Sequence, residues 1–280
     1  MTEKKKDQGR ANRAIRGKQA RPERRVPLEP QELLEDVLVG RNAVTEALRA
    51  GRDINRLLLA EGDREGSIAE ILALAKERGI VWQFVERSKI EAVAGGHRHQ
   101  GVLAYVAPVE YADMEDILHR AKESGEPPFL LLLDGLEDPH NLGALLRTAD
   151  ATGVHGVLLP KRRSVSLNAT VAKTSAGAIE YVPVAHIGNV VQTLKGLKEK
   201  GFWVAGADMG GQQAYYEANL TGPLVLVIGS EGKGISRLAR EACDFLVSLP
   251  MVGHINSLNA SVAGSIMMYE VLRQRREQKT

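Results

Sequence analysis

Asn141 and Arg147 lie in the stretch DGLEDPHNLGALLRTADATGV (134–154), which follows a run of apolar residues. Asn141 alone is most simply the cap of a helix predicted over 141–152. Arg147 lies in an otherwise apolar part of that helix, where a guanidinium would be costly to bury unless it reached solvent or an anion. Its planar fork suits phosphate or carboxylate groups. The two side chains would lie within about 120° of each other around the helix axis.

A glycine-rich loop, VIGSEGKGIS (227–236), contains the second group of interest. Its three glycines come between a predicted strand and a predicted helix, so backbone amides there can contact a ligand. The spacing is not that of a Walker A loop, because Gly234 rather than Ser or Thr follows Lys233. Glu231 in this loop either caps the next helix or faces a bound molecule, and the residue type leaves both interpretations open.

Ser257 and Asn259 precede the amphipathic helix of a third stretch, HINSLNASVAGSIMMYEVLRQRR (254–276). One Ser or Asn is enough to cap a helix, so this stretch carries more polar groups than a helix start requires. Small residues beside them allow another segment to approach closely. The pattern predicts either the wall of a binding pocket or a tight helix contact.

Alternating strands and helices are predicted to position these groups. The run FLLLLD (129–134) is typical of a strand buried on both faces of a parallel sheet. Five further strands are predicted over 156–160, 181–184, 202–207, 223–229 and 245–250. Helices are predicted over 141–152, 167–177, 189–200, 235–241 and 259–276. Such sheets bind ligands at the carboxyl ends of their strands, where all three polar groups fall.

A smaller α/β unit precedes this sheet. Its predicted strands and helices alternate over 40–51, 54–60, 67–79, 80–85, 88–96 and 101–107. Ser67 is the expected cap of the helix that it begins. Pro108 and the turn-rich SGEPP then interrupt the pattern. We therefore expect a small α/β domain over 36–108, a linker over 109–128 and a larger domain over 129–276.

The first thirty residues form a basic arm. Residues 1–30 contain ten Lys and Arg against four acidic residues, although the whole chain has a net charge of only +2. Such a segment is predicted to be disordered and to contact a polyanion such as nucleic acid, with a solvating tail as the alternative. The single cysteine, Cys243, fits a reducing cytoplasm. We expect neither a transmembrane helix nor a secretory signal.

The motifs DPHNLGALLRTADATGV, LVIGSEGKGIS and LPMVGHINSLNASVAGSIMMYEVLRQR, in this order, resemble those of the SpoU/TrmH family of RNA ribose 2′-O-methyltransferases, a branch of the SPOUT superfamily. VLVGRNAVTEAL and HRHQGVLAYV are similar to the substrate-binding domain of one subgroup. The resemblance covers roughly residues 37–276. Within the family, the motifs most resemble those of the bacterial enzymes that methylate the ribose of a guanosine in 23S rRNA.

The resemblance implies a parallel sheet with a C-terminal deep trefoil knot, preceded by a small α/β RNA substrate-binding domain. It implies S-adenosyl-L-methionine (SAM) as the cofactor, held by the loops of the knot. It also implies a homodimer that assembles through the catalytic domain, with helix 259–276 as a major part of the interface. RNA would be the partner, without contact to a membrane or to DNA.

Residue roles also follow from the resemblance. The catalytic positions would be Asn141, Arg147, Glu231, Ser257 and Asn259. The cofactor would be held largely by backbone groups at Ala207, Gly229, Leu249 and Leu258. Arg147 would either act as a base beside a phosphate or hold that phosphate and polarise the ribose 2′-hydroxyl. We favour the second role, because a guanidinium ordinarily stays protonated in proteins.

The exact substrate stays open at this stage. Methylation of tRNA and resistance-type methylation of another rRNA site both occur in the family. A non-catalytic RNA-binding protein of ribosome assembly is the alternative from another class, but it would not need all five candidate catalytic residues. A nucleotide-dependent dehydrogenase is disfavoured, because DGLEDPHN follows the first strand in place of a glycine fingerprint.

His97 and His99, in the stretch GGHRHQG, could resemble a pair of metal ligands. With Cys243 remote and no acid expected nearby, they favour an RNA-facing loop, and a solvated loop is the alternative. His140 and His254 lie beside the candidate catalytic residues without gaining a role from that position. We therefore expect no metal site.

Overall fold

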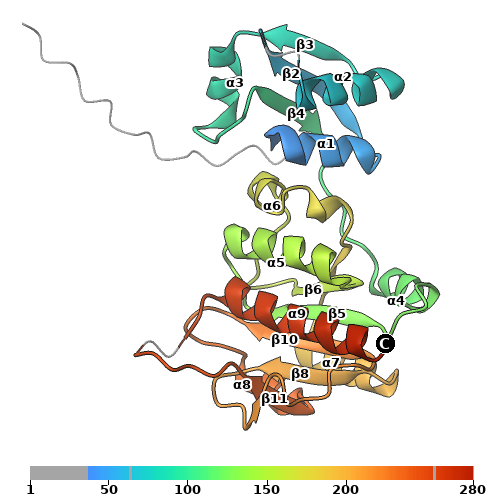
Figure 1. Ribbon diagram of the computed structural model, residues 1–280, viewed down its shortest axis with the longest axis vertical. Coiled ribbons are helices and arrows are strands. Elements are labelled where there is room, and N and C mark those ends of the chain that lie inside the picture. Colours follow the sequence, from blue (N-terminus) through green and yellow to red (C-terminus); the bar gives the residue numbers. More distant parts are fainter. Residues whose placement is uncertain (1–36, 63–64, 255–256, 280) are drawn as a thin grey trace, which may run out of the picture.

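The computed structural model describes residues 37–62, 65–254 and 257–279 as two α/β domains, one above the other in Figure 1. The basic arm over 1–30 lies outside the described residues. No helix in the described ranges is long and apolar enough to cross a membrane.

The N-terminal domain is a four-stranded sheet with helices on both sides. Its strands, in the order β1-β4-β2-β3, are Val37–Val39, Val102–Val106, Ile54–Ala60 and Trp82–Val85. Its helices are α1 (Arg41–Arg49), α2 (Ser67–Glu77) and α3 (Arg87–Ala94). The predicted elements are all present, and β1 was not expected. Ser67 is not the cap of α2, because Gly66 holds that position and Ser67 is the first helical residue.

The larger domain is built on a seven-stranded sheet in which every described strand pair is parallel. The strands, in the order β7-β6-β5-β10-β8-β11-β9, are Val184–Ile187, Gly156–Pro160, Phe129–Asp134, Leu224–Gly229, Trp203–Ala207, Phe245–Ser248 and Gln213–Ala214. The predicted parallel sheet is therefore confirmed. The late strand β10 lies between β5 and β8.

Helices cover both faces of this sheet. They are α4 (Met114–Glu123), α5 (Pro139–Thr152), α6 (Ala169–Thr174), α7 (Val190–Glu199), α8 (Arg237–Ala242) and α9 (Ala260–Glu277). Helices α5 and α9 lie side by side on one face (Figure 1). Strand β5 shows why its sequence is apolar throughout. Phe129, Leu131 and Leu133 are fully buried in the core on one face, and Leu130 and Leu132 in the core on the other.

Two expected segments differ from the structure. The strand expected over 181–184 begins later, as β7 (Val184–Ile187). The 3₁₀ turn Ala178–Glu180 precedes it, and the chain enters the sheet only after Pro183. Residues 109–128 are not a simple linker, because they contain α4. Ile117 of α4 is fully buried in the core of the larger domain, so this helix belongs to that domain.

Polar contacts join the two domains. Arg52 donates from Nη1 to Glu180 Oε1 at 2.7 Å, and these side chains are only 9% and 7% exposed. The Tyr181 hydroxyl donates to Glu46 Oε2 at 2.7 Å. This bond to Glu46 raises the pKa of Tyr181 to about 12. The contacts fix the N-terminal domain beside α6 and the 3₁₀ turn (Figure 1).

Replacing Tyr181 with phenylalanine is expected to destabilise the protein by about 1 kcal/mol, because one hydrogen bond to a partly exposed carboxylate is lost. The expected fall in thermal midpoint is about 2–4 °C. Tyr216→Phe is the matched control, since Tyr216 is exposed. Equal midpoints for the two variants would show that the Glu46 contact adds nothing to stability.

Candidate active site

A hydrogen-bonded network joins three of the predicted catalytic residues. Asn141 Nδ2 donates to Glu231 Oε1 at 3.0 Å, and Asn259 Nδ2 donates to Asn141 Oδ1 at 2.9 Å. Asn259 Nδ2 also donates to Glu231 Oε1. Asn141 is buried, whereas Glu231 and Asn259 are exposed. The structure therefore brings together residues that lie 90 and 118 positions apart in the sequence.

The first turn of α5 places Asn141 in this network. The helix begins earlier than predicted: Asp138 caps it by accepting a hydrogen bond from the His140 amide at 2.9 Å, and Pro139 is its first residue. The interpretation of Asn141 as the cap is therefore wrong. Because Asp138 already performs the capping, the Asn141 amide is available for Glu231 and Asn259.

Asn259 both caps α9 and belongs to the network. Its Oδ1 accepts hydrogen bonds from the backbone amides of Ser261 at 2.9 Å and Val262 at 3.2 Å. The Ser261 hydroxyl also donates to this oxygen at 2.6 Å. Since Oδ1 serves the helix, Nδ2 is left to point at Asn141 and Glu231. Asn259 is thus oriented by the start of α9 itself.

The glycine-rich loop after β10 places Glu231. Gly232 and Gly234 have φ angles of +78° and +64°. Residues with a side chain rarely adopt such backbone angles, and glycine allows the loop to turn tightly here. A Cβ on Gly229 would lie 2.0 Å from the Gly234 carbonyl carbon, so no side chain fits there. Glu231 does not cap the next helix, because Ser236 occupies that position.

A pocket of about 570 Å³ opens at the carboxyl ends of β8, β10 and β11. Its wall includes all four residues predicted to hold a cofactor, Ala207, Gly229, Leu249 and Leu258. Ser257 and Glu231 also line it, so Glu231 joins the pocket to the hydrogen-bonded network. A pocket of this size can hold a nucleoside-sized ligand.

Several lining residues were not predicted. Asp208 and Arg240 line the pocket and form an ion pair, with Arg240 Nη2 at 2.8 Å from Asp208 Oδ1. Lys233 and Met251 also contribute to the wall. Asp208 directly follows β8, so its position at the carboxyl end of a predicted strand could have indicated a place in the site. Arg240 lies 32 residues away, so only the fold could reveal its contact with Asp208.

Arg147 lies outside this network. It is exposed on α5, and within the described ranges it makes no hydrogen bond or ion pair. The next residue, Thr148, contacts Ser265 of α9 through their hydroxyl groups at 2.9 Å, which fixes α5 against α9. The guanidinium is therefore carried by an anchored helix while its own donors remain available to an anion.

The described residues contain no group of three or more His, Cys, Asp and Glu side chains arranged to hold a metal ion. His99 is buried in the N-terminal domain and His254 is exposed. Burial raises the pKa of the Cys243 thiol to about 11, so this cysteine is protonated at neutral pH. None of these groups joins the candidate active site.

Comparisons with known proteins agree with the geometry. Residues 128–269 match the model of the SpoU rRNA Methylase family, and residues 37–112 match the model for RNA 2′-O ribose methyltransferase substrate binding. The chain thus belongs to the SpoU rRNA methylase family, also named the TrmH family. The predicted membership is confirmed.

One relative and two solved structures illustrate this membership. The Bacillus subtilis (strain 168) protein YacO, named as a TrmH family tRNA/rRNA methyltransferase, is 50% identical over 240 residues, which are 86% of this chain and 96% of YacO. A crystal structure of an RNA 2′-O ribose methyltransferase has a TM-score of 0.72 at 26% identity, covering 86% of this chain and 88% of that one. AviRb from Streptomyces viridochromogenes, a SpoU methyltransferase crystallised with AdoMet, has a TM-score of 0.72 at 23% identity over 86% and 90% of the two chains. The likeness to AviRb concerns the fold.

Proposed function

We propose that this protein is a SAM-dependent RNA ribose 2′-O-methyltransferase that acts on a guanosine of 23S rRNA. Membership of the family supports the reaction class. One observation carries the proposal: Glu231 accepts hydrogen bonds from Asn141 and Asn259 and also lines a nucleoside-sized pocket, so it joins the polar network to that pocket. A non-catalytic RNA-binding protein would not need this arrangement.

SAM is the proposed occupant of the pocket, as AdoMet is the cofactor in the AviRb crystal structure. The residues present fit such a molecule. Leu249 and Leu258 offer apolar surface to an adenine ring, and the carboxylate of Glu231 suits a cationic group. Ala207 and Gly229 are the last residues of β8 and β10, so their backbone groups lie at the pocket. SAM supplies an electrophilic methyl group bonded to a positively charged sulfur.

The side chains of this protein would position the RNA. Arg147 holds a phosphate beside the target ribose and polarises its 2′-hydroxyl. Asn141, Glu231 and Asn259 orient the ribose, and Ser257 lines the pocket wall. In the reaction the ribose oxygen bonds to the methyl carbon, the carbon–sulfur bond breaks, and the hydroxyl proton leaves to solvent. Alignment of these atoms supplies a large part of the acceleration.

A methyl-transfer assay with labelled SAM tests this function on two substrates, unmodified 23S rRNA and bulk tRNA. We expect label in 23S rRNA, at the ribose of a single guanosine. Label only in tRNA would support the second candidate function, tRNA methylation. This candidate is kept because YacO is named as a tRNA/rRNA methyltransferase. Label in neither RNA, with SAM binding confirmed, would contradict both and point to a resistance-type or assembly-dependent target. Absence of SAM binding would overturn the enzyme proposal.

The proposed chain path includes a deep trefoil knot in the C-terminal part of the larger domain. Two observations support it. Strand β10 lies between β5 and β8 although it follows both in sequence, and the segments after β8, β10 and β11 all line one pocket. Knots are rare exceptions to the usual connectivity of proteins.

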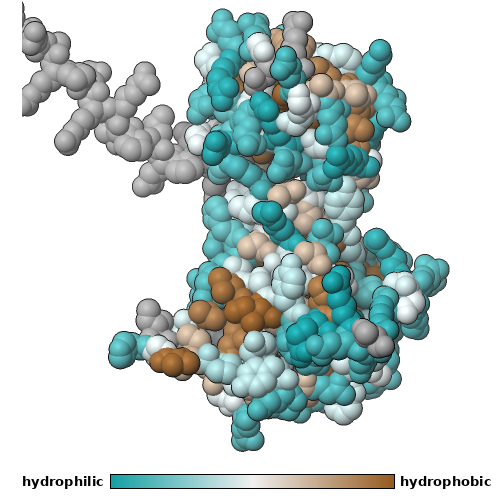
Figure 2. All heavy atoms as spheres, in the orientation of Figure 1, coloured by the Kyte–Doolittle hydropathy of each residue, from teal (hydrophilic) through white to brown (hydrophobic). Residues whose placement is uncertain are grey.

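A homodimer is the proposed assembly, with α9 at the interface. Val262, Ile266 and Tyr269 are 46%, 36% and 53% exposed, and their spacing puts them on one side of α9. Figure 2 shows hydrophobic surface over this part of the molecule. The opposite side of α9 is buried through Met267, Met268 and Val271. An apolar helix side of this kind suits contact with a second copy.

Replacing Ile266 with aspartate is expected to convert the dimer to a monomer, because a carboxylate would be buried in the interface at a cost of several kcal/mol. Light scattering at micromolar protein concentration measures the mass. Leu238→Asp is the matched control, since Leu238 is 55% exposed on α8. A monomeric wild-type protein, or a dimer that tolerates Ile266→Asp, would rule out this interface.

A further inference from the structure

The N-terminal domain contains a second pocket, which we call the arginine pocket. Its volume is about 470 Å³, and it opens where the loop between α3 and β4 meets the start of α1. The residues that line it are Arg41, Arg87, Glu91, Gly96, His97, Arg98, His99 and Gln100. None of these residues lines the proposed cofactor pocket.

The loop that forms this pocket is anchored to α3 by a buried histidine. His99 is only 3% exposed. Its Nδ1 accepts a hydrogen bond from the Gly101 amide at 3.0 Å, so the ring proton lies on Nε2, which donates to Glu91 Oε2 at 2.8 Å. The position of Glu91 beside His99 was not expected, since no acid was predicted near this histidine. Glu91 is also the acidic residue of the pocket wall, so its carboxylate is already hydrogen-bonded to His99.

A second anchor joins the loop to α1. Gln100 Oε1 accepts from the Arg41 backbone amide at 3.2 Å, and the Gln100 carbonyl accepts from Arg41 Nε at 2.9 Å. Gln100 has a φ angle of +52°, which non-glycine residues rarely adopt. The bonds of His99 and Gln100 therefore anchor the loop, and Arg98 directly precedes these two anchored residues.

The pocket has an excess of positive charge. It contains three arginines and one acidic residue, and that acid is bonded to His99. Arg87 and Arg98 are exposed, and among the described residues they form no hydrogen bond or ion pair. Guanidinium groups presented in this way bind phosphate through paired N–H donors. Arg41 adds charge although its Nε already serves Gln100.

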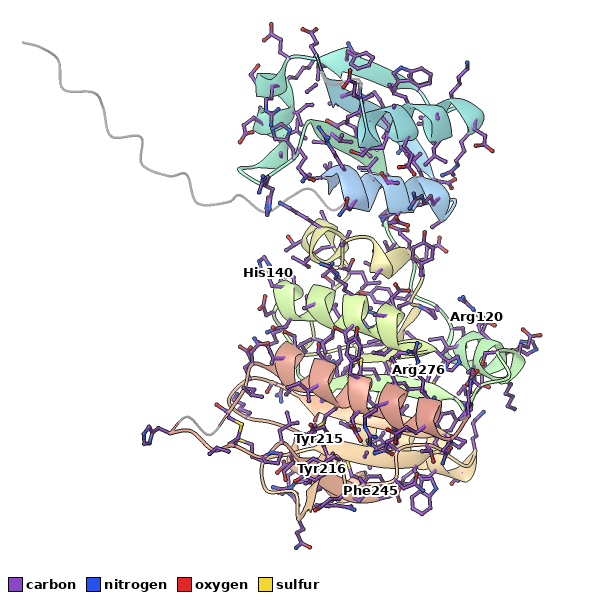
Figure 3. The ribbon with its side chains drawn as sticks, viewed as in Figure 1. Arg120, His140, Tyr215, Tyr216, Phe245 and Arg276 are labelled. Atoms are coloured by element: carbon purple, nitrogen blue, oxygen red, sulfur yellow. The ribbon has the colours of Figure 1, made fainter. Side chains whose placement is uncertain are left out.

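The loop that forms the pocket lies on the same side of the molecule as the starts of α5 and α9, where the candidate active site is built. In Figure 1 the loop between α3 and β4 lies on the side where α5 and α9 begin. His140, the second residue of α5, is labelled on that side in Figure 3, and Arg120 of α4 lies on the opposite side. One RNA molecule can therefore extend from the active site to the N-terminal domain.

We propose that the arginine pocket binds a backbone phosphate of the substrate RNA, with Arg87 and Arg98 as its ligands. This inference rests on the proposed function for the identity of the RNA. It assigns a definite contact within a domain whose family model names only substrate binding. Such a contact fixes the position of the RNA on the enzyme without reading its sequence.

The test compares two double variants of the full-length protein, with an unmodified 23S rRNA transcript as the probe. Arg87→Gln with Arg98→Gln removes both proposed ligands. Arg120→Gln with Lys122→Gln removes the same charge from α4, where both residues are exposed. RNA affinity is measured over a range of salt concentrations, and methyl transfer is measured at saturating RNA.

For the pocket variant, we expect RNA affinity to fall about tenfold or more and the salt slope to decrease by about one for each arginine. The kcat at saturating RNA and the affinity for SAM should equal those of wild type. The control variant should keep wild-type affinity. Equal RNA affinity and salt slope for the two variants would overturn the proposed phosphate site. If the wild-type protein binds RNA but methylates none, the proposed function fails, while the comparison of affinities still decides the role of the pocket.

Discussion

Replacing Arg147 with lysine is expected to lower kcat about 100-fold, while thermal stability and affinity for SAM remain close to wild type. Lysine keeps the charge but loses the planar fork that can hold a phosphate and a hydroxyl together. Loss of one donor aimed at the reacting group typically costs a factor of this size. Stability should be unaffected, because Arg147 is exposed and forms no hydrogen bond or ion pair in the described part of the chain.

Single-turnover methyl transfer at saturating RNA measures this effect, and Arg120→Lys is the control for an exposed arginine on another helix. RNA affinity should change little, since lysine also contacts phosphate as a point charge. Wild-type kcat in Arg147→Lys would rule out the proposed role of Arg147.

Replacing Glu231 with glutamine is the second change with a large expected effect. Glu231 Oε1 accepts hydrogen bonds from the amides of Asn141 and Asn259. Glutamine keeps an oxygen at this position, so the fold and the loop should persist. The negative charge at the edge of the pocket is removed, and the orientation of the network is weakened. We expect kcat to fall about 100-fold, which corresponds to about 2.7 kcal/mol of transition-state stabilisation.

Glu241→Gln is the matched control, because Glu241 is an exposed acid on α8 that pairs only with Arg237 in the described residues. Its kcat should equal that of wild type. The thermal midpoint of Glu231→Gln should stay within about 3 °C of wild type, as expected for an exposed polar substitution. Normal turnover in this variant would show that the charge of Glu231 has no part in the reaction.

Buried strands were predictable from the sequence because their apolar runs are continuous. FLLLLD fills both cores of the larger domain, and this is the pattern of a central parallel strand. Strand β9 spans only Gln213–Ala214, which is too short to show any periodicity. Helix α4 did carry signals, since Asp113 caps it and Ile117, Leu118 and Ala121 form its buried side. The turn-rich residues on either side of it favoured a linker instead.

The candidate site was predictable in its residue types but not in its contacts. Asp138 followed by Pro139 is the usual start of a helix, and this pair would have freed Asn141 from the role of a cap. The bonds of Asn141 to Glu231 and Asn259 depend on how β10 and α9 are brought to α5. No local pattern in the sequence encodes that approach. No local pattern encodes the pairing of His99 with Glu91 either. Glu91 lies on α3, and His99 lies in the loop that follows this helix.

Mass spectrometry of nucleosides from treated RNA tests the central claim most directly. Unmodified 23S rRNA is incubated with SAM and wild-type protein, Arg147→Lys or Glu231→Gln, and then digested to nucleosides. We predict 2′-O-methylguanosine with the wild-type protein and about a hundredth of its rate of formation with either variant. A methyl group on a base instead of a ribose, or equal product from all three proteins, would contradict the proposed reaction and its active site.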